Sequence, residues 1–213
     1  VREVYPGVHL GLWQIGESVS DFLESYPWMK VYIKDLELYK SEGRKLEFLA
    51  VRALLREMLL IAGYSEEQIG KIGEITHDEC GKPLLNKFNI SISHTRGFAS
   101  VIISKSRSVA VDIEYYNDRV ERIASKFLRR DEKAEGLDAL LVHWCAKETV
   151  YKLFSAEDLQ YGEMRLKPFD PMMDWNCEVE NLKSHKSVNV DFELTMEFVL
   201  TLSLIHISEP TRH

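Results

Sequence analysis

The chain has 213 residues, with 27 Lys and Arg against 34 Asp and Glu, so its formal charge is −7. This acidic balance argues against a general nucleic-acid binder, because such proteins carry a basic excess that neutralises phosphates. With 45% hydrophobic and 29% charged residues, the composition is that of a globular protein with a sizeable core, as one large domain or two small ones. No apolar run approaches the roughly 20 residues of a membrane helix.

Cysteine usage and the acidic N-terminal segment both favour the cytoplasm. Cys80, Cys145 and Cys177 are scattered along the chain and form neither a disulfide framework nor a metal-ligand spacing. Several carboxylates interrupt residues 1–30, where a signal peptide would need an apolar segment. We therefore expect a cytoplasmic protein without a membrane partner.

The first half of the chain mixes helix and strand. Gly81-Lys82-Pro83 predicts a turn, because glycine and proline favour turn conformations. Phe88–Ser93 and Phe98–Ser104 are typical of two hairpin strands, joined by residues 94–97. Before them we expect a strand around Val8–Trp13, a short helix near Ser18–Ser25, the longest helix over Ser41–Ala62, and a short helix opened by a capping box at Ser65–Gln68.

The second half repeats this mixture. We therefore predict an α+β fold in which two similar α/β halves, residues 1–106 and 107–213, form a pseudo-dimer with the working cleft between them. The elements that we expect in the second half are a strand at Val109–Glu114, a helix at Asn117–Leu128 with Asn117 as its N-cap, a long helix at Leu137–Phe154, and strands at Trp175–Glu180, Val190–Met196 and Phe198–Ile205.

Two carboxylates stand on one face of the predicted strand 109–114. Side chains two positions apart on a strand share a face, about 6.5 Å apart along the chain, so Asp112 and Glu114 point away from Val111 and Ile113. Carboxylates on one face repel each other unless water or a cation screens them. A solvated outer face and a cation site are both compatible with this pattern.

A third carboxylate lies on the predicted helix 137–154. Glu148 falls in the middle of an apolar stripe, where a charge is costly unless a group pairs with it. Either Lys152 pairs with it at i,i+4 spacing, or Glu148 is an oxygen ligand beside Asp112 and Glu114. Three carboxylates without His or Cys favour a hard ion, above all Mg²⁺, which also binds substrate phosphates. The stripe consists of Leu137, Leu140, Leu141, Trp144 and Cys145.

These residues resemble the motifs of the 4′-phosphopantetheinyl transferase superfamily. Asp112-x-Glu114 is similar to its hydrophobic-Gly-hydrophobic-Asp-x-Glu strand, although Ala110 stands where the family usually has Gly. Trp144-Cys145-Ala146-Lys147-Glu148-x-x-x-Lys152 is similar to its Trp/Phe-Ser/Cys/Thr-x-Lys-Glu-x-x-x-Lys helix. Further similar segments, in the same order as in the family, are Gly81-Lys82-Pro83, Ser93-His94-Thr95, and Phe127 with Glu132.

The resemblance implies a reaction and a set of partners. At this length the chain resembles the larger, monomeric surfactin-synthetase type, whose two halves enclose coenzyme A. The activity would transfer 4′-phosphopantetheine from coenzyme A to a serine of an apo acyl or peptidyl carrier protein and release 3′,5′-ADP. Mg²⁺ would be held by Asp112, Glu114, Glu148 and the coenzyme A pyrophosphate. Glu148, directly or through a metal-bound water, would take the serine proton, and Lys152 would neutralise charge on the phosphate.

The resemblance also implies that the first half holds the nucleotide. An arginine at the start of the long helix contacts the 3′-phosphate in the family, and its match here is either Arg44 or Lys45. Arg52 matches a second family arginine that could equally brace the two halves. Solvated surface positions and a locally bonded histidine are the alternatives for these side chains. The remaining candidates for coenzyme A contacts are Lys82, Pro83, Ser93 and His94, with Thr95 as a further hydroxyl, and Lys152 from the second half.

Two rival functions use the same residues. A Mg²⁺-dependent nuclease also carries Asp-x-Glu with a later Glu and Lys, but it needs the lysine on a strand, whereas Lys152 is expected on a helix. A catalytically silent module could retain the coenzyme A site alone. We assign Cys145 to packing, and Ser208–His213 to a disordered or non-native tail. The acceptor remains open among fatty-acid, polyketide, nonribosomal-peptide and lysine-pathway carriers.

Overall fold

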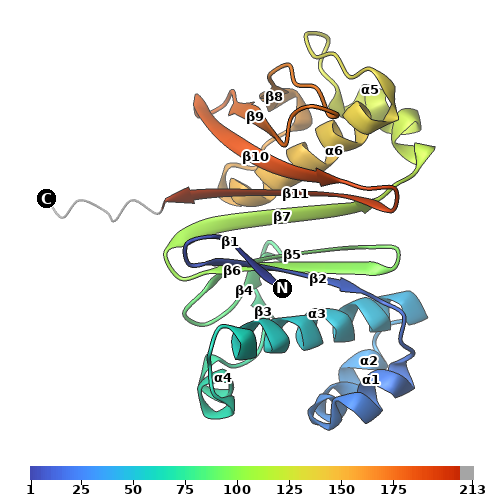
Figure 1. Cartoon of the computed structure of the whole chain (residues 1–213), viewed down its shortest axis with the longest axis vertical. Coiled ribbons are helices and arrows are strands. Elements are labelled where there is room, and N and C mark those ends of the chain that lie inside the picture. The colour runs from blue at the N-terminus through green and yellow to red at the C-terminus, as the bar shows by residue number, and fades with distance from the viewer. Residues whose placement is uncertain (207–213) are drawn as a thin grey trace, which may run out of the picture.

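A computed structural model of the chain describes residues 1–206, in which two antiparallel sheets lie between helices on their outer faces (Figure 1). The four-stranded sheet has the order β1-β2-β6-β5, and the five-stranded sheet has the order β7-β11-β10-β9-β8. A two-stranded β3–β4 hairpin lies beside the first sheet. The α+β class that we predicted from the sequence is confirmed.

The first sheet is covered by α3, which packs closely on β2. A Cβ atom at Gly11 of β2 would lie 2.6 Å from Sδ of Met58 and 2.7 Å from Cδ1 of Leu54. Glycine at position 11 therefore allows α3 to pack closer to the sheet than a residue with a Cβ atom would allow. The elements here are β1 (Arg2–Tyr5), β2 (Val8–Gln14), α1 (Val19–Ser25), a 3₁₀ helix (Pro27–Tyr32), α2 (Ile33–Leu36), α3 (Glu42–Ile61), α4 (Glu66–Ile72), β3 (Thr76–His77), β4 (Pro83–Leu84), β5 (Asn89–Thr95) and β6 (Phe98–Ser104).

The second sheet is covered by α6. The predicted helix over residues 117–128 is instead a 3₁₀ helix followed by one turn of α-helix, although Asn117 is the N-cap as expected. The elements are β7 (Arg107–Tyr115), a 3₁₀ helix (Asp118–Ile123), α5 (Ala124–Phe127), α6 (Gly136–Leu153), 3₁₀ turns (Ser155–Glu157 and Tyr161–Glu163), β8 (Met164–Leu166), β9 (Asn176–Asn181), β10 (Lys186–Leu194) and β11 (Phe198–His206).

The hairpin between β5 and β6 is tighter than the sequence predicted. His94 and Thr95 belong to β5, where they pair with Ala99 and Phe98 of β6. The turn consists of only Arg96 and Gly97, and Gly97 has a φ of +79°, which favours glycine. His94 therefore lies on a strand, with its orientation fixed by the sheet.

Apolar side chains form three clusters. One lies between α3 and the first sheet, and another lies between α6 and the second sheet. The third lies between the two sheets and joins the halves, because it contains Val8 and Leu10 of β2 together with Val111 and Ile113 of β7. The predicted alternation of β7 is confirmed, since Ala110 on the opposite face packs in the α6 cluster.

A row of hydroxyl groups joins the edges of the two sheets. Ser91, Ser93 and Thr95 of β5 each accept a hydrogen bond from a backbone N–H of β7, at 3.2, 3.2 and 3.1 Å. The donors are alternate residues, Val111, Ile113 and Tyr115. We call Ser91, Ser93 and Thr95 the hydroxyl row. It satisfies β7 backbone donors at an edge where no neighbouring strand does.

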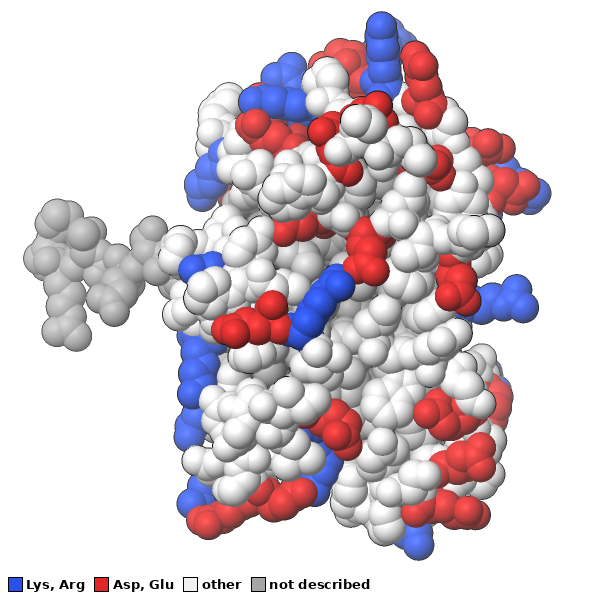
Figure 2. Space-filling view, viewed as in Figure 1, with Lys and Arg blue, Asp and Glu red and all other residues white. Residues whose placement is uncertain are grey.

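Charges of both signs are interspersed over the face drawn in Figure 2, which shows no continuous basic surface for the residues described there. Within residues 1–206, no helix has the length and apolar character needed to cross a membrane. The tail that we predicted at Ser208–His213 lies outside the described residues.

Candidate active site

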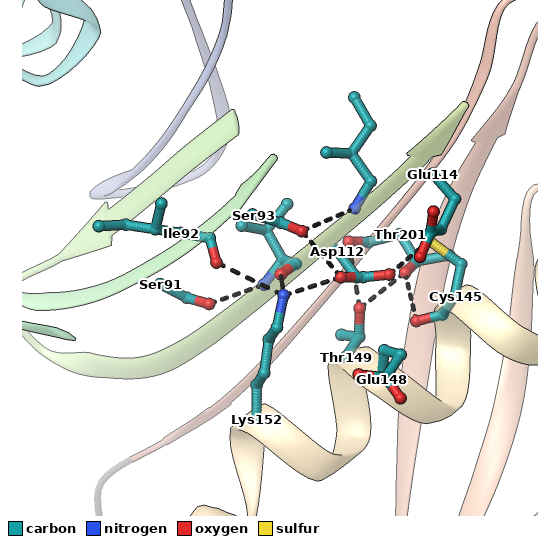
Figure 3. Close-up of polar contacts among 12 residues, drawn as sticks. Ser91, Ile92, Ser93, Asp112, Glu114, Cys145, Glu148, Thr149, Lys152 and Thr201 are labelled. Carbon is teal, nitrogen blue, oxygen red and sulfur yellow. Dashed lines mark hydrogen bonds and ion pairs between the residues drawn. The ribbon is translucent and has the colours of Figure 1, made fainter. Parts of the chain in front are cut away.

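Asp112 of β7 lies at the centre of a polar cluster between the two halves (Figure 3). Its side chain is 7% exposed. Oδ1 accepts hydrogen bonds from Ser93 Oγ at 2.8 Å and from Lys152 Nζ at 2.7 Å, and Oδ2 accepts one from Cys145 Sγ at 3.2 Å. A buried carboxylate is tolerated here because every oxygen has a donor.

Lys152 connects helix α6 to both sheets. Besides its ion pair with Asp112, its Nζ donates to the backbone oxygens of Val111 on β7 at 3.0 Å and Ile92 on β5 at 3.4 Å. The alternative in which Lys152 pairs with Glu148 is wrong for this structure, because its ion pair is with Asp112. The ammonium thus stands where α6, β5 and β7 meet.

Glu114 and Glu148 are each held by an aromatic donor. Trp144 donates its indole N–H to Oε1 of Glu114 at 2.9 Å, and Tyr161 donates its hydroxyl to Oε1 of Glu148 at 2.5 Å. Trp144 lies one turn before Glu148 on α6, and its ring lies 5.4 Å from that of Tyr161. Neither partner of these glutamates was identified from the sequence.

The surroundings of Glu114 and Glu148 disfavour their charged forms. Burial raises the pKa of Glu114, and the nearby charges of Asp112 and Glu148 raise it further. Burial likewise raises the pKa of Glu148, and the charge of Asp112 adds to this effect. Asp112 and Glu148 thus act on Glu114, and Asp112 acts on Glu148, so the three carboxylates lie close enough to interact electrostatically.

The donor set has the chemistry of a site for a hard divalent cation. It consists of carboxylate oxygens without His or Cys ligands, and a cation would relieve the repulsion that raises the pKa values of Glu114 and Glu148. In residues 1–206, no three His, Cys, Asp or Glu side chains are already gathered around one point as metal ligands. The residue types therefore fit Mg²⁺, while each carboxylate is engaged by a protein donor.

A fully buried ion pair anchors the loops around this cluster. Lys147 Nζ lies 2.7 Å from Glu132 Oε2, and both side chains are 0% exposed. The ammonium also donates to the backbone oxygens of Phe127 at 2.7 Å and Tyr161 at 3.4 Å. Lys147 directly precedes Glu148, the candidate base. Through its bond to the backbone oxygen of Tyr161, Lys147 links α6 to the loop whose hydroxyl contacts Glu148. Lys147 and Glu132 were both noted as motif residues in the sequence, but their contact was not predicted.

In the first half, Arg44 and His94 line one cavity of about 290 Å³. Arg44 Nη1 lies 3.2 Å from His94 Nε2 and 3.0 Å from Glu47 Oε2. Burial lowers the pKa of His94, and although Glu47 opposes this, Arg44 lowers it further, so the imidazole is neutral near pH 7. Arg44 and His94 thus share the carboxylate of Glu47, which lies 3.2 Å from Nδ1 of His94 and also lines the cavity.

Arg44 and Lys45 differ in their surroundings, although each pairs with a glutamate of α3. Arg44 lines the cavity, whereas the ammonium of Lys45 pairs with Glu42 at 3.3 Å. Arg52 also lines the cavity, but its guanidinium stacks 3.3 Å over the Phe48 ring and donates to the Phe48 carbonyl oxygen at 3.1 Å. Arg52 therefore has packing contacts that account for its position.

Lys82 and Pro83 line a different cavity, of about 520 Å³. The Nζ atom of Lys82 donates to Ser155 Oγ at 3.2 Å, which links the turn after β3 to the segment after α6. Ser93 lines neither of these two cavities. Its hydroxyl donates to Asp112 and accepts from the backbone N–H of Ile113. The predicted nucleotide residues are thus distributed over two cavities and the hydroxyl row.

Cys145 behaves as a packing residue, as expected. Its side chain is fully buried in the α6 cluster, and burial raises the pKa of its thiol well above the ordinary value. A thiol that resists ionisation is a poor nucleophile.

Residues 108–203 match the family model of the 4′-phosphopantetheinyl transferase superfamily. None of the curated proteins matches the chain. The matched span begins in β7 and ends in β11, so it contains Asp112, Glu114, Glu148 and Lys152 but not the predicted nucleotide residues of the first half. This similarity supports the superfamily and, in general terms, a transferase of the phosphopantetheinyl type.

Proposed function

We propose that the protein transfers 4′-phosphopantetheine from coenzyme A to a serine of an apo acyl or peptidyl carrier protein and releases 3′,5′-ADP. The observation that carries this proposal is the cluster of Asp112, Glu114, Glu148 and Lys152 inside the segment similar to the superfamily. We further propose the larger type within the superfamily, acting as a cytoplasmic monomer whose halves, residues 1–106 and 107–213, contribute nucleotide contacts and carboxylates respectively.

The proposed chemistry is a phosphoryl transfer. The serine oxygen of the carrier attacks the phosphorus that bears the pantetheine, a new P–O bond forms, and the bond to 3′,5′-ADP breaks with its electron pair on the leaving oxygen. Glu148 accepts the serine proton, directly or through a water molecule. Burial raises the pKa of Glu148, which makes it a stronger base than an ordinary carboxylate.

Asp112, Glu114 and Glu148 would hold Mg²⁺ together with the pyrophosphate of coenzyme A. When bound, the ion would offset negative charge on the phosphoryl group. Lys152 would supply a second positive charge to the phosphate oxygens, and its position at the junction of α6, β5 and β7 places it between the halves. Mg²⁺ and Mn²⁺ both suit such oxygen ligands, and we propose Mg²⁺.

The 3′-phosphate of the nucleotide would bind at Arg44 and His94. Their shared cavity and the guanidinium of Arg44 support this placement. Arrival of a phosphate dianion would raise the pKa of the neutral His94 and favour its protonation. We propose Lys82 and Pro83, which line the second cavity, as contacts for the rest of the nucleotide.

The test is the release of 3′,5′-ADP from coenzyme A in the presence of a panel of apo carrier proteins, measured by chromatography. We expect release only when the protein, Mg²⁺ and a carrier with its serine are all present, and none when that serine is replaced by alanine. Release independent of any carrier would contradict transfer. Coenzyme A binding without release from any carrier would favour the silent module, and Mg²⁺-dependent nicking of plasmid DNA would favour the nuclease.

A further inference from the structure

Trp144 and Tyr161 share a geometry that the proposed reaction does not itself explain. Each donates one hydrogen bond to one oxygen of one glutamate. Among residues 1–206, no protein donor bonds to Oε2 of Glu114 or of Glu148. The two donors thus occupy one oxygen of each carboxylate and leave the other available.

The two donors are held rigidly, as a positioning role requires. The Trp144 ring lies between the rings of Phe127, at 5.3 Å, and Tyr161, at 5.4 Å. The backbone of Tyr161 is fixed by the buried Lys147, and its 3₁₀ turn is closed by a capping box between Gln160 and Glu163. These contacts hold the indole N–H and the phenol hydroxyl toward the two glutamates.

A carboxylate that accepts a protein hydrogen bond at one oxygen favours binding a metal ion through its other oxygen alone. Mg²⁺ takes near-ideal octahedral geometry with oxygen ligands used singly, whereas Ca²⁺ takes six to eight ligands and commonly binds both oxygens of a carboxylate. Two carboxylates restricted in this way would therefore disfavour the larger ion. Partners that orient a metal ligand through such hydrogen bonds change metal affinity by about 10–100-fold when removed.

We propose that Trp144 and Tyr161 are positioning residues that select Mg²⁺ over Ca²⁺ by holding Glu114 and Glu148 as single-oxygen ligands. This inference rests on the proposed metal site at Asp112, Glu114 and Glu148. It concerns the side chains behind the carboxylates and makes no use of the carrier protein.

The experiment measures metal binding directly on the full chain. Loss of the free Mn²⁺ signal in electron paramagnetic resonance gives the Mn²⁺ affinity, and competition with Mn²⁺ gives the affinities for Mg²⁺ and Ca²⁺. Each titration is run with and without coenzyme A, and a titration of coenzyme A without protein is the blank. The variants are Tyr161→Phe and Trp144→Phe, which remove the donors but keep aromatic rings. The matched controls are Tyr151→Phe and Trp175→Phe, whose side chains are exposed by 40% and 69%.

We expect each donor variant to lose about 10–100-fold in Mg²⁺ affinity and distinctly less in Ca²⁺ affinity, so that the preference for Mg²⁺ narrows. The controls should match the unaltered protein, and circular dichroism should show the same fold throughout. Unchanged affinities, or equal losses for both ions, would overturn the inference while leaving the metal site intact. Absence of any protein-bound Mn²⁺ in the unaltered chain would overturn the metal site, and the inference with it.

Discussion

At the scale of single residues, the cluster around Asp112 separates what sequence can predict from what it cannot. The carboxylates and Lys152 follow from strand and helix periodicity, because period two puts Asp112 beside Glu114 and the apolar stripe carries Glu148. Their partners do not follow, because Ser93 lies on another strand and Tyr161 in a loop without a motif. Periodicity orients a side chain within its element but does not say what faces it.

Glu114 provides a residue-scale prediction about stability. Folding raises its pKa above the ordinary value of 4.5, mainly through burial. A raised carboxyl pKa contributes stability below the unfolded pKa, and that contribution is lost as the pH rises through the folded pKa. Near pH 7 and without metal, Glu114 therefore lowers the stability of the fold relative to its effect near pH 4.

We expect Glu114→Gln to raise Tm at pH 7 by about 2–4 °C, which corresponds to a gain on the order of 1 kcal/mol in the free energy of unfolding. Glutamine removes the ionisable group but keeps an oxygen that accepts the hydrogen bond of the Trp144 indole. The gain should vanish near pH 4, where Glu114 is protonated. Scanning calorimetry in chelator, with the exposed Glu24→Gln as control, measures both effects. A lower Tm at pH 7, or a gain of the same size at pH 4, would count against this account.

At the scale of elements, α6 brings together most of the site. One helix supplies Trp144, Lys147, Glu148 and Lys152, which respectively contact Glu114, Glu132, Tyr161 and Asp112. The bounds of this helix were predicted within one residue at each end, because its apolar periodicity is long. Short elements were predicted less well, since β1, β3, β4 and β8 span only two to four residues, too few for a periodic pattern to show.

The hydroxyl row gives an element-scale prediction. Ser91→Ala removes the acceptor of the buried Val111 N–H and leaves that donor without a partner. We expect a loss of about 1–3 kcal/mol in the free energy of unfolding, measured by urea titration. The exposed Ser125→Ala is the control and should change it by less than about 0.5 kcal/mol. If both variants were equally stable, the row would have no structural importance.

At the scale of the whole molecule, the two halves share a core. The apolar cluster between the sheets takes side chains from β2 and β6 on one side and from β7 and β11 on the other. Sequence pattern indicated two halves of mixed structure, but the face-to-face packing of their sheets could not be read from either half alone.

Because this core is shared, we expect the halves to unfold together. Scanning calorimetry should give one transition, with a calorimetric enthalpy equal to the van't Hoff enthalpy. Two separated transitions would show that residues 1–106 and 107–213 are independent folding units, and would contradict a shared core.

The net charge of −7 also acts at this scale. Carrier proteins of the proposed kind are typically acidic, so a globally acidic enzyme must meet them through a local basic or apolar surface. Three of the carboxylates are assigned to the metal site, and those charges would be offset when the ion is bound.

The central claim is transfer of phosphopantetheine with Glu148 as the base, and the intact mass of a carrier tests it most directly. An apo carrier is incubated with coenzyme A and Mg²⁺ and with the unaltered protein, Glu148→Gln or the control Glu24→Gln. We predict a gain of one phosphopantetheine with the unaltered protein and the control, and none with Glu148→Gln. No gain on any of several diverse carriers, or an undiminished gain with Glu148→Gln, would contradict the account.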